Sequence, residues 1–291
     1  MQKQFNNIVL VGKYQDAQMR DQIIALAEFL RERGLNVLLE TNTAQCADIN
    51  DYSTVELAQI GTGANSQVDL VIVLGGDGTM LGVARALLEQ QIPLLGVNRG
   101  RIGFLTDISA KDMLKIVSEV LVGSYLLERR LMLQASVVRK GATLFTGFAL
   151  NDVVISKGEA ARLVDLEVTI DGQFVHRQRS DGLIIATPTG TTAYALSAGG
   201  PILHPTLEAI TLVPICPHTL SNRPITIHSA SKVCITLVDK NNSHIHLDGQ
   251  STLELLHNDR ILVQSAEKML PLLHPTGHCH FDMLRKKLNW G

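Results

Sequence analysis

Several stretches of the sequence carry residue types that could bind or activate a phosphorylated ligand. The first is the motif GGDGT at Gly75–Thr79, which follows the apolar run Val68–Leu74. Glycines here let backbone N–H groups approach a phosphate, and the N-terminus of a following helix adds a favourable dipole. The pattern is not GxxxxGK[ST], so a Walker A loop is excluded. The Asp77 carboxylate could deprotonate a hydroxyl or hold a phosphate-bound metal ion, or it could simply cap the helix.

Two further stretches offer groups suited to an anion or a ribose. Residues 96–106 (GVNRGRIGFLT) follow another apolar run and place three glycines around Arg99 and Arg101. They suit a loop that closes over an anionic ligand and, equally, a plain turn between domains. Asn151 and Asp152 interrupt the strand-like segment LNDVVIS. They either mark a β-bulge or reach the hydroxyls and amide edges of a ligand.

The longest candidate stretch runs from Gln178 to Pro201. Its short apolar strand, LIIA at residues 183–186, leads into a threonine-rich loop with a single tyrosine, Tyr194. Hydroxyl groups offer hydrogen bonds to a nucleotide, and the tyrosine ring offers a stacking face. Threonine is also an ordinary turn residue, so the hydroxyls alone could be turn chemistry. Their concentration favours a loop that binds a ligand.

The elements that must position these loops alternate between strands and helices in the first third of the chain. Apolar runs predict strands at Asn7–Val11, Leu35–Leu39, Val68–Leu74 and Pro93–Val97. Helical periodicity predicts helices over Asp16–Glu32 and about Thr79–Glu89. The nearly continuous apolar character of the third run is typical of a parallel strand covered on both faces. We therefore expect an open, parallel, Rossmann-like α/β sheet whose ligand lies at the carboxyl ends of the strands.

The pattern changes near Gly123. Beyond it, apolar and polar residues alternate, and turns such as Lys140–Gly141 and Asp171–Gly172 recur. This alternation predicts antiparallel strands in a β-rich, sandwich-like second domain. Residues 281–290 are helix-like again, and we expect them to return to the first domain. The predicted organisation is an α/β domain at 1–122, a β-rich domain at 123–275 and a C-terminal segment at 276–291.

Composition and charge narrow the class of protein. The 291 residues are 45% hydrophobic and 19% charged, with 26 Lys and Arg against 28 Asp and Glu. These values are typical of a folded chain, and the lack of a basic excess argues against nucleic acid as a partner. No apolar run approaches the length of a membrane span, and no signal-like segment follows Met1. We therefore expect a cytoplasmic protein that does not bind a membrane.

The cysteines and histidines predict no metal ion held by dedicated protein ligands. None of the cysteines lies in a CxxC pair, so we interpret all four as free thiols: Cys46, Cys216, Cys234 and Cys279. The densest group of metal-ligand types comprises His274, His278, Cys279 and His280. Neighbours on one short segment rarely converge on a tetrahedral ion, so solvated or partner-facing imidazoles are the alternative. His244, His246 and Asp248 alternate on a predicted strand, so their side chains could face the same side. An ordinary polar face of a strand explains this pattern as well.

Together, these stretches resemble those of bacterial NAD kinases. GGDGT, GVNRGRIGFLTD, LNDVVIS and QRSDGLIIATPTGTTAYALSAGGP follow one another, and the match spans about Val68 to Gln250. GGDGT is shared with diacylglycerol, sphingosine and phosphofructo-kinases, whereas the second and fourth stretches are more particular to NAD kinases. The resemblance implies transfer of the terminal phosphoryl group of ATP, with Mg²⁺ or another divalent metal, to NAD. The acceptor would be the 2′-hydroxyl of the adenosine ribose, and the product NADP.

The resemblance also implies which residues form the site. Asp77 resembles the catalytic aspartate, and we expect it to accept the proton of the ribose hydroxyl. Asn151 and Asp152 fall on the pair that holds the adenosine ribose and base, where the family usually has Asn-Glu. The carboxylate here is one methylene shorter than that glutamate. The other implied contacts are Gly78, Arg162, Arg179, Asp181, Thr192, Ala193, Tyr194, Ala195, Leu196, Ser197 and Gln250.

The same resemblance implies a homo-oligomer, a dimer or a tetramer, with NAD between the two domains. Two other functions stay open at this point. A GGDGT-type kinase of a lipid diol would show an apolar or basic stretch for the membrane, which is not evident here. A non-catalytic dinucleotide sensor would not need Asp77 in a full glycine loop. A Rossmann dehydrogenase is set aside because no GxGxxG motif follows Val11.

Overall fold

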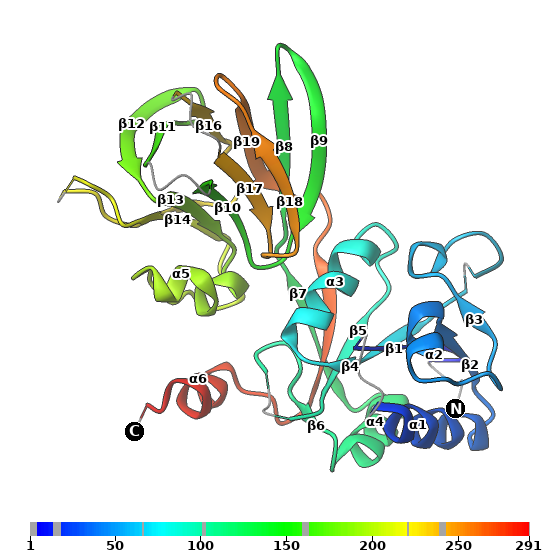
Figure 1. Ribbon diagram of the computed structural model, residues 1–291. Coiled ribbons are helices and arrows are strands. Elements are labelled where there is room, and N and C mark those ends of the chain that lie inside the picture. The colour runs from blue at the N-terminus through cyan, green and yellow to red at the C-terminus, as the bar shows by residue number, and fades with distance from the viewer. Residues whose placement is uncertain are drawn as a thin grey trace. The chain divides into compact units, whose positions relative to one another are not determined.

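The computed structural model describes residues 5–13, 19–65, 67–100, 103–158, 163–219, 221–238 and 243–290. The chain divides into two compact units (Figure 1). The first unit comprises residues 1–129 and 270–291, and the second comprises residues 130–269. The predicted boundaries lay at 122–123 and 275–276. The first differs because strand Tyr125–Arg130 (β7) joins the sheet of the first unit. The second differs because strand Leu270–Pro275 (β20) pairs in parallel with Leu94–Asn98 (β5) and so belongs to the first unit.

The first unit is built on one sheet with the strand order β3-β2-β1-β4-β5-β20-β7, and β6 pairs with β5. The strand pairs from β3 to β20 and the β5–β6 pair are parallel. The remaining strands are β1 (Asn7–Gly12), β2 (Asn36–Glu40), β3 (Thr54–Val55), β4 (Leu70–Gly75), β6 (Ile108–Ser109) and β7 (Tyr125–Arg130). Every residue of β4 is buried, as expected for a parallel strand covered on both faces.

The helices that pack on this sheet are α1 (Arg20–Glu32), α2 (Thr41–Cys46), α3 (Asp77–Leu87) and α4 (Met113–Leu121). A further helix, α6 (His280–Leu288), follows β20. Short 3₁₀ turns lie at Leu57–Gln59 and Gly63–Asn65. In α1, Ile23, Leu26, Ala27 and Leu30 form a buried stripe with helical spacing. This stripe packs in one apolar cluster with alternate strand residues such as Ile8 and Ile72. The first residues of the predicted helix Asp16–Glu32 lie partly outside the described residues, and the described helix begins at Arg20.

The second unit contains two six-stranded antiparallel sheets, with the orders β15-β14-β13-β10-β17-β18 and β12-β11-β16-β19-β8-β9. Their strands are β8 (Leu133–Arg139), β9 (Ala142–Ala149), β10 (Asp152–Lys157), β11 (Val164–Ile170), β12 (Gln173–Ser180), β13 (Gly182–Ala186), β14 (Ala209–Ile215), β15 (Ile225–His228), β16 (Val233–Leu237), β17 (Ser243–Leu247), β18 (Ser251–Leu255) and β19 (Arg260–Ser265). Short turns of helix follow β13 at Thr189–Thr192 (η4) and Tyr194–Ser197 (α5).

The core of the second unit lies between the two sheets. Alternate residues of β11, such as Val164 and Leu166, are buried in the same cluster as Val153 and Ile155 of β10. The period of two that the sequence displays is therefore the alternation between the core and the outer face of each sheet. The predicted fold class, a parallel α/β unit followed by a β-rich unit, is confirmed. All four cysteines are free thiols, as predicted. Among the described residues, no helix is both long and apolar enough to span a bilayer.

Candidate functional site

Asp77 stands at the first turn of α3, immediately after β4. Gly76 is the N-cap residue of this helix, so the alternative in which Asp77 caps the helix is wrong. The helix also begins two residues earlier than predicted, because the glycines end the strand and the turn starts at once. The Asp77 side chain turns instead toward the segment Gly103–Thr106, which follows β5, the neighbour of β4 in the sheet. Adjacent parallel strands therefore bring two of the predicted stretches together.

The Asp77 carboxylate is held by hydrogen bonds from the Gly103–Thr106 loop. The backbone N–H of Phe104 donates to Oδ2 at 2.8 Å. Oδ1 accepts from the backbone N–H groups of Leu105 at 3.1 Å and Thr106 at 3.2 Å, and from the Thr106 hydroxyl at 3.0 Å. Because a carboxylate has about four acceptor positions, Oδ2 is the oxygen with room for another donor.

Gly103 makes this arrangement possible. A Cβ added at Gly103 would collide with Oδ1 of Asp77 and would lie 2.6 Å from Oγ1 of Thr106. Only glycine lets the loop pass this close to the carboxylate. Gly76, by contrast, faces open space, where a Cβ would meet nothing within 4 Å. Arg101 of the same loop lies outside the described residues.

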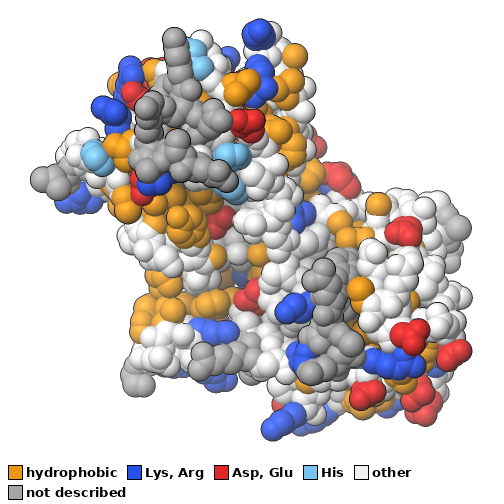
Figure 2. Space-filling model, in the orientation of Figure 1, with side chains coloured by type: hydrophobic (Ala, Val, Ile, Leu, Met, Phe, Trp, Pro, Cys, Tyr) orange, Lys and Arg blue, Asp and Glu red, His pale blue; other side chains and the backbone are white. Residues whose placement is uncertain are grey.

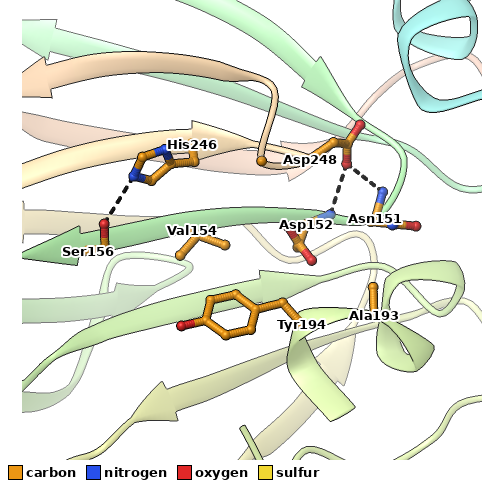
Figure 3. Close-up of a pocket in the computed structure, with 9 residues that line it drawn as sticks. Asn151, Asp152, Val154, Ser156, Ala193, Tyr194, His246 and Asp248 are labelled. Carbon is orange, nitrogen blue, oxygen red and sulfur yellow. Dashed lines mark hydrogen bonds between the residues drawn. The ribbon is translucent and has the colours of Figure 1, made fainter. Parts of the chain in front are cut away.

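The second unit holds a cavity of about 400 Å³ beside β10 and β17. Figure 3 shows the Tyr194 ring facing Val154 across it, with His246 and Ser156 at one end and Asp248 and Asn151 at the other. Tyr194 is 47% exposed, so much of its ring is available as a stacking surface. The lining residues are Asn151, Asp152, Val154, Ser156, Ala193, Tyr194, His246, Asp248 and Gly249.

Asp248 fixes the backbone at the rim of this cavity. Its Oδ1 accepts hydrogen bonds from the N–H groups of Asn151 at 2.7 Å and Asp152 at 3.2 Å. Its Oδ2 accepts from the N–H of Leu150 at 3.1 Å. A buried carboxylate that binds successive backbone amides holds the turn rigidly. The side chains of Asn151 and Asp152 are therefore left to the cavity rather than to the fold.

Asp152 has an unusual acidity for an aspartate. Its side chain is buried, and burial raises the pKa of its carboxyl group to about 7; the negative charge of Asp248 adds to the rise. Near neutral pH this carboxyl group exchanges between its ionised and protonated forms. The protonated form can donate one hydrogen bond and accept others, which suits a diol.

His246 closes one end of the cavity. One ring nitrogen, Nε2, lies 3.0 Å from the hydroxyl of Ser156, and the other, Nδ1, lies 3.0 Å from the hydroxyl of Thr252. Burial and the neighbouring His244 lower the pKa of this imidazole below its usual value. The ring is therefore neutral at physiological pH and acts as a hydrogen-bonding group rather than a cation.

The threonine-rich loop packs directly on Asn151. A Cβ at Gly190 would collide with the backbone oxygen of Asn151, and the Thr187 hydroxyl donates to the carbonyl of Leu150 at 2.5 Å. The hydroxyls of Thr191 and Thr192 donate to carbonyls of the loop itself, at 2.6 Å and 3.1 Å. These two hydroxyls therefore stabilise the turn, which is the alternative to ligand binding that the sequence left open for them. Among the loop's residues, Ala193 and Tyr194 line the cavity.

The predicted site residues thus fall into four groups. Four of them meet at the cavity: Asn151, Asp152, Ala193 and Tyr194. Asp77 and Gly78 belong to the other unit, and Arg162 lies outside the described residues. The others do not line the cavity: Arg179, Asp181, Thr192, Ala195, Leu196, Ser197 and Gln250. Of these, Asp181 pairs with Lys157, whose Nζ lies 2.6 Å from Oδ1.

The cavity is also lined by residues that the sequence did not assign to the site, namely Val154, Ser156, His246, Asp248 and Gly249. The pairing of β10 with β17 sets Val154 opposite His246 and Ser156 opposite His244. The alternation of His244, His246 and Asp248 was the available signal. It became informative only once the partner strand was known, because a period of two also describes any polar strand face.

Comparison with known proteins agrees with these features. Residues 8–125 match the model of the ATP-NAD kinase N-terminal domain, and residues 150–274 match that of the ATP-NAD kinase C-terminal domain. The chain is 49% identical to an NAD kinase of Thiobacillus denitrificans, over 100% of this chain and 99% of that protein. It is 47% identical to an NAD kinase of Aromatoleum aromaticum, over 100% of this chain and 96% of that protein.

Solved structures give the same result. A yeast NADH kinase, crystallised with NADH, superimposes with a TM-score of 0.91 at 26% identity, over 100% of this chain and 89% of that one. An NAD kinase from Archaeoglobus fulgidus, crystallised with ATP, shares the fold with a TM-score of 0.76 at 23% identity, over 98% and 100% of the two chains. These comparisons do not favour the lipid-kinase or sensor alternatives. The chain belongs to the ATP-NAD kinase family, which confirms the family and the kinase function predicted from the sequence.

Proposed function

We propose that the chain transfers the terminal phosphoryl group of ATP to the 2′-hydroxyl of the adenosine ribose of NAD, with Asp77 as the general base. The observation that carries this assignment is the Asp77 carboxylate, oriented by four hydrogen bonds at the end of a parallel strand. A ribose hydroxyl is a poor nucleophile, and a fixed carboxylate can accept its proton as the phosphoryl group transfers. Oδ2 is the proposed acceptor atom, because Oδ1 already accepts three of the four bonds.

The phosphates of ATP are proposed to lie at the N-terminus of α3. The helix dipole and the backbone N–H groups of the glycine turn favour an anion there. A Cβ at Gly76 would meet no protein atom within 4 Å, so packing does not require glycine at this position. The glycine instead leaves this space free for a phosphate, which supports the proposal. Binding and orientation of this kind supply most of the catalysis of phosphoryl transfer.

A divalent ion, Mg²⁺ for example, is proposed to accompany ATP and to neutralise charge on the transferring phosphoryl group. Mg²⁺ keeps several waters and binds mainly through substrate phosphates, so it needs few protein ligands. The described residues at the start of α3 fit this requirement, because Asp77 is the acidic residue of its first turn. The ion is therefore assigned to the ATP complex rather than to a preformed protein cage.

The adenosine end of NAD is proposed to occupy the cavity of the second unit. The half-exposed ring of Tyr194 offers a stacking face for the base. Asn151 can donate and accept at once, which matches an adenine edge, and Asp152 is proposed to bind the ribose diol. The shorter side chain of Asp152, where the family usually has glutamate, is compatible with this role because Asp248 holds its backbone at the cavity rim.

We further propose a cytoplasmic homo-oligomer, a dimer or a tetramer. Hydrophobic side chains are visible at the surface of both units in Figure 2. Two of these side chains lie on the opposite edge strands of one sheet of the second unit: Phe174 on β12 is 64% exposed, and Leu144 on β9 is 50% exposed. Exposed apolar groups on edge strands are suited to contact with another copy of the chain.

The test is an assay of phosphoryl transfer from Mg·ATP by the purified protein, in which release of ADP is measured with every acceptor and NADP is identified with an NADP-specific dehydrogenase. NAD, NADH, adenosine and a diacylglycerol dispersion are compared as phosphoryl acceptors. We expect phosphorylation of the dinucleotides and none of the lipid. Dinucleotide binding without turnover would instead support a sensor, and lipid phosphorylation would overturn the assignment of the acceptor.

A further inference from the structure

Three buried side chains converge in the first unit, and the glycine motif contributes none of them. Asp107 lies just before β6, His274 lies in β20, and His278 lies between β20 and α6. Oδ2 of Asp107 is 2.8 Å from Nδ1 of His274 and 2.6 Å from Nδ1 of His278. The two imidazole rings stack with their centroids 3.9 Å apart. A single carboxylate oxygen thus gathers two imidazoles that are far from it in the sequence.

This cluster is not satisfied by the protein groups around it. The side chains of Asp107 and His278 are each 5% exposed, and that of His274 is 0% exposed. Oδ1 of Asp107 and Nε2 of His278 are buried and have no hydrogen-bond partner among the described residues. Oδ1 of Asp107 therefore keeps lone pairs that a cation could take in addition to the contacts of Oδ2 with the two imidazoles.

The donor set suits a transition-metal ion. One carboxylate oxygen and two imidazole nitrogens, all within 4.8 Å of one another, match the ligands preferred by Zn²⁺ and similar divalent ions.

A second carboxylate stands behind the cluster. Oε2 of Glu128, in β7, lies 3.7 Å from Nε2 of His274, on the side of the ring opposite Asp107. Histidines that bind a metal through one nitrogen generally direct the other nitrogen toward a carboxylate or a carbonyl group. Glu128 occupies that outer position for His274.

We propose that Asp107, His274 and His278 bind a divalent transition-metal ion, with Zn²⁺ as the representative, at a site separate from the ion carried by ATP. The ligand atoms, now at hydrogen-bond distances of 2.6 and 2.8 Å, would separate to about 3.3 Å around a tetrahedral ion. Each imidazole would bind the ion through Nδ1 as the neutral tautomer that carries its proton on Nε2, so the rings need not lose a proton. Three protein ligands leave the fourth position to water.

The proposed ion would act on the position of Asp77 without touching it. Asp107 directly follows Thr106, whose backbone N–H and hydroxyl both donate to Asp77. An ion at Asp107 would join this loop to the segment between β20 and α6. Its expected effect is on stability and on the ordering of the loop, and it takes no part in the chemical step.

The test uses the full chain after removal of metal with a chelator. Zn²⁺ is titrated by calorimetry, and Co²⁺ is used as a visible probe of the ligands. We expect a single tight site per chain, a Co²⁺ spectrum of nitrogen and oxygen ligands without a thiolate charge-transfer band, and a higher melting temperature with Zn²⁺. Absence of a stoichiometric site in the wild-type chain would overturn the proposal, and so would a thiolate band, because it would place Cys279 on the ion.

Variants locate the ion within the chain. Asp107→Asn and His278→Gln should each weaken Zn²⁺ binding at least about tenfold and abolish the Zn²⁺-dependent rise in melting temperature. Cys279→Ser, which changes the residue next to His278, is the matched control and should retain both. Loss of Zn²⁺ binding in Cys279→Ser, with binding retained in Asp107→Asn and His278→Gln, would contradict the assignment of the ligands. If a variant does not fold, the Co²⁺ spectrum of the wild-type chain still decides between the two sets of ligands.

Discussion

In both units an aspartate accepts hydrogen bonds from backbone N–H groups of a neighbouring loop, but the two aspartates have opposite roles. Asp77 accepts from Phe104, Leu105 and Thr106, and Asp248 accepts from Leu150, Asn151 and Asp152. Asp77 remains partly exposed, with room at Oδ2, whereas Asp248 is buried at 9% exposure. In the first unit the loop orients the aspartate; in the second the aspartate orients the loop.

The proposed chemical step is thus assigned to the first unit, and the proposed binding of NAD to the second. Changes at Asp77 and its loop should lower turnover, while changes at the cavity of the second unit should weaken the binding of NAD.

The largest effect is expected at the proposed base. Asp77→Asn removes the proton acceptor but keeps the size of the side chain and one carbonyl oxygen for the loop. We expect kcat to fall by about 10²–10⁴, the usual contribution of general base catalysis. Steady-state kinetics of NADP formation measures the change. Turnover within threefold of the wild type would show that Asp77 is not the base.

A smaller loss of turnover is expected from the loop that orients Asp77. The Cβ of Gly103→Ala would collide with Oδ1 of Asp77, so the carboxylate must move. We expect kcat to fall by about 10²-fold, because a displacement of about 1 Å has this effect on aligned groups. Gly277→Ala, in the same unit, where a Cβ meets nothing within 4 Å and φ is not positive, is a control for the general effect of an added methyl group. Equal kinetics for Gly103→Ala and the wild type would show that this loop does not orient Asp77 for catalysis.

The cavity should show the opposite kinetic signature. Tyr194→Ala removes the stacking surface, and we expect KM for NAD to rise about tenfold, since stacking of a base on an aromatic ring contributes about 1–3 kcal/mol. The KM for ATP should stay unchanged. Tyr194→Phe keeps the ring and should behave like the wild type. A loss confined to kcat would contradict the binding role of this residue.

The smallest effect concerns pH and stability. The pKa of Asp152 in the folded chain is about 7, above the ordinary 3.8, so the folded state holds a proton that the unfolded state has released. The free energy of unfolding should therefore fall as pH rises through this range, by about 1 kcal/mol between pH 6 and pH 7. Asp152→Asn lacks this proton, and urea unfolding at both pH values should show the difference between the two proteins. Parallel pH dependence in both would mean that the pKa of Asp152 is ordinary.

Local patterns in the sequence were sufficient for much of the fold. The apolar run at residues 68–74 predicted a strand buried on both faces, and β4 occupies residues 70–75. Alternation in the second half predicted antiparallel sheets, and β11 buries alternate residues. These predictions succeed because burial of a strand or helix face imposes a short period on neighbouring residues.

Features that depend on distant pairing could not be predicted. The bonds between Asp77 and the Gly103–Thr106 loop require that β4 and β5 be neighbours. The role of Asp248 requires the pairing of β10 with β17. The histidines at 274 and 278 were judged as a local cluster, and Asp107, the residue that joins them, is 167 positions from His274. No short-range pattern carries such information, because it arises from the register of the sheets.

The separation of chemistry from binding is tested most directly by measuring the Kd for NAD of Asp77→Asn beside that of Tyr194→Ala, by calorimetry without ATP. We predict that Asp77→Asn binds NAD within about twofold of the wild type although its turnover is greatly reduced, and that Tyr194→Ala binds about tenfold more weakly. If Asp77→Asn lost affinity as Tyr194→Ala does, Asp77 would be a binding residue, and the proposed division between the two units would be wrong.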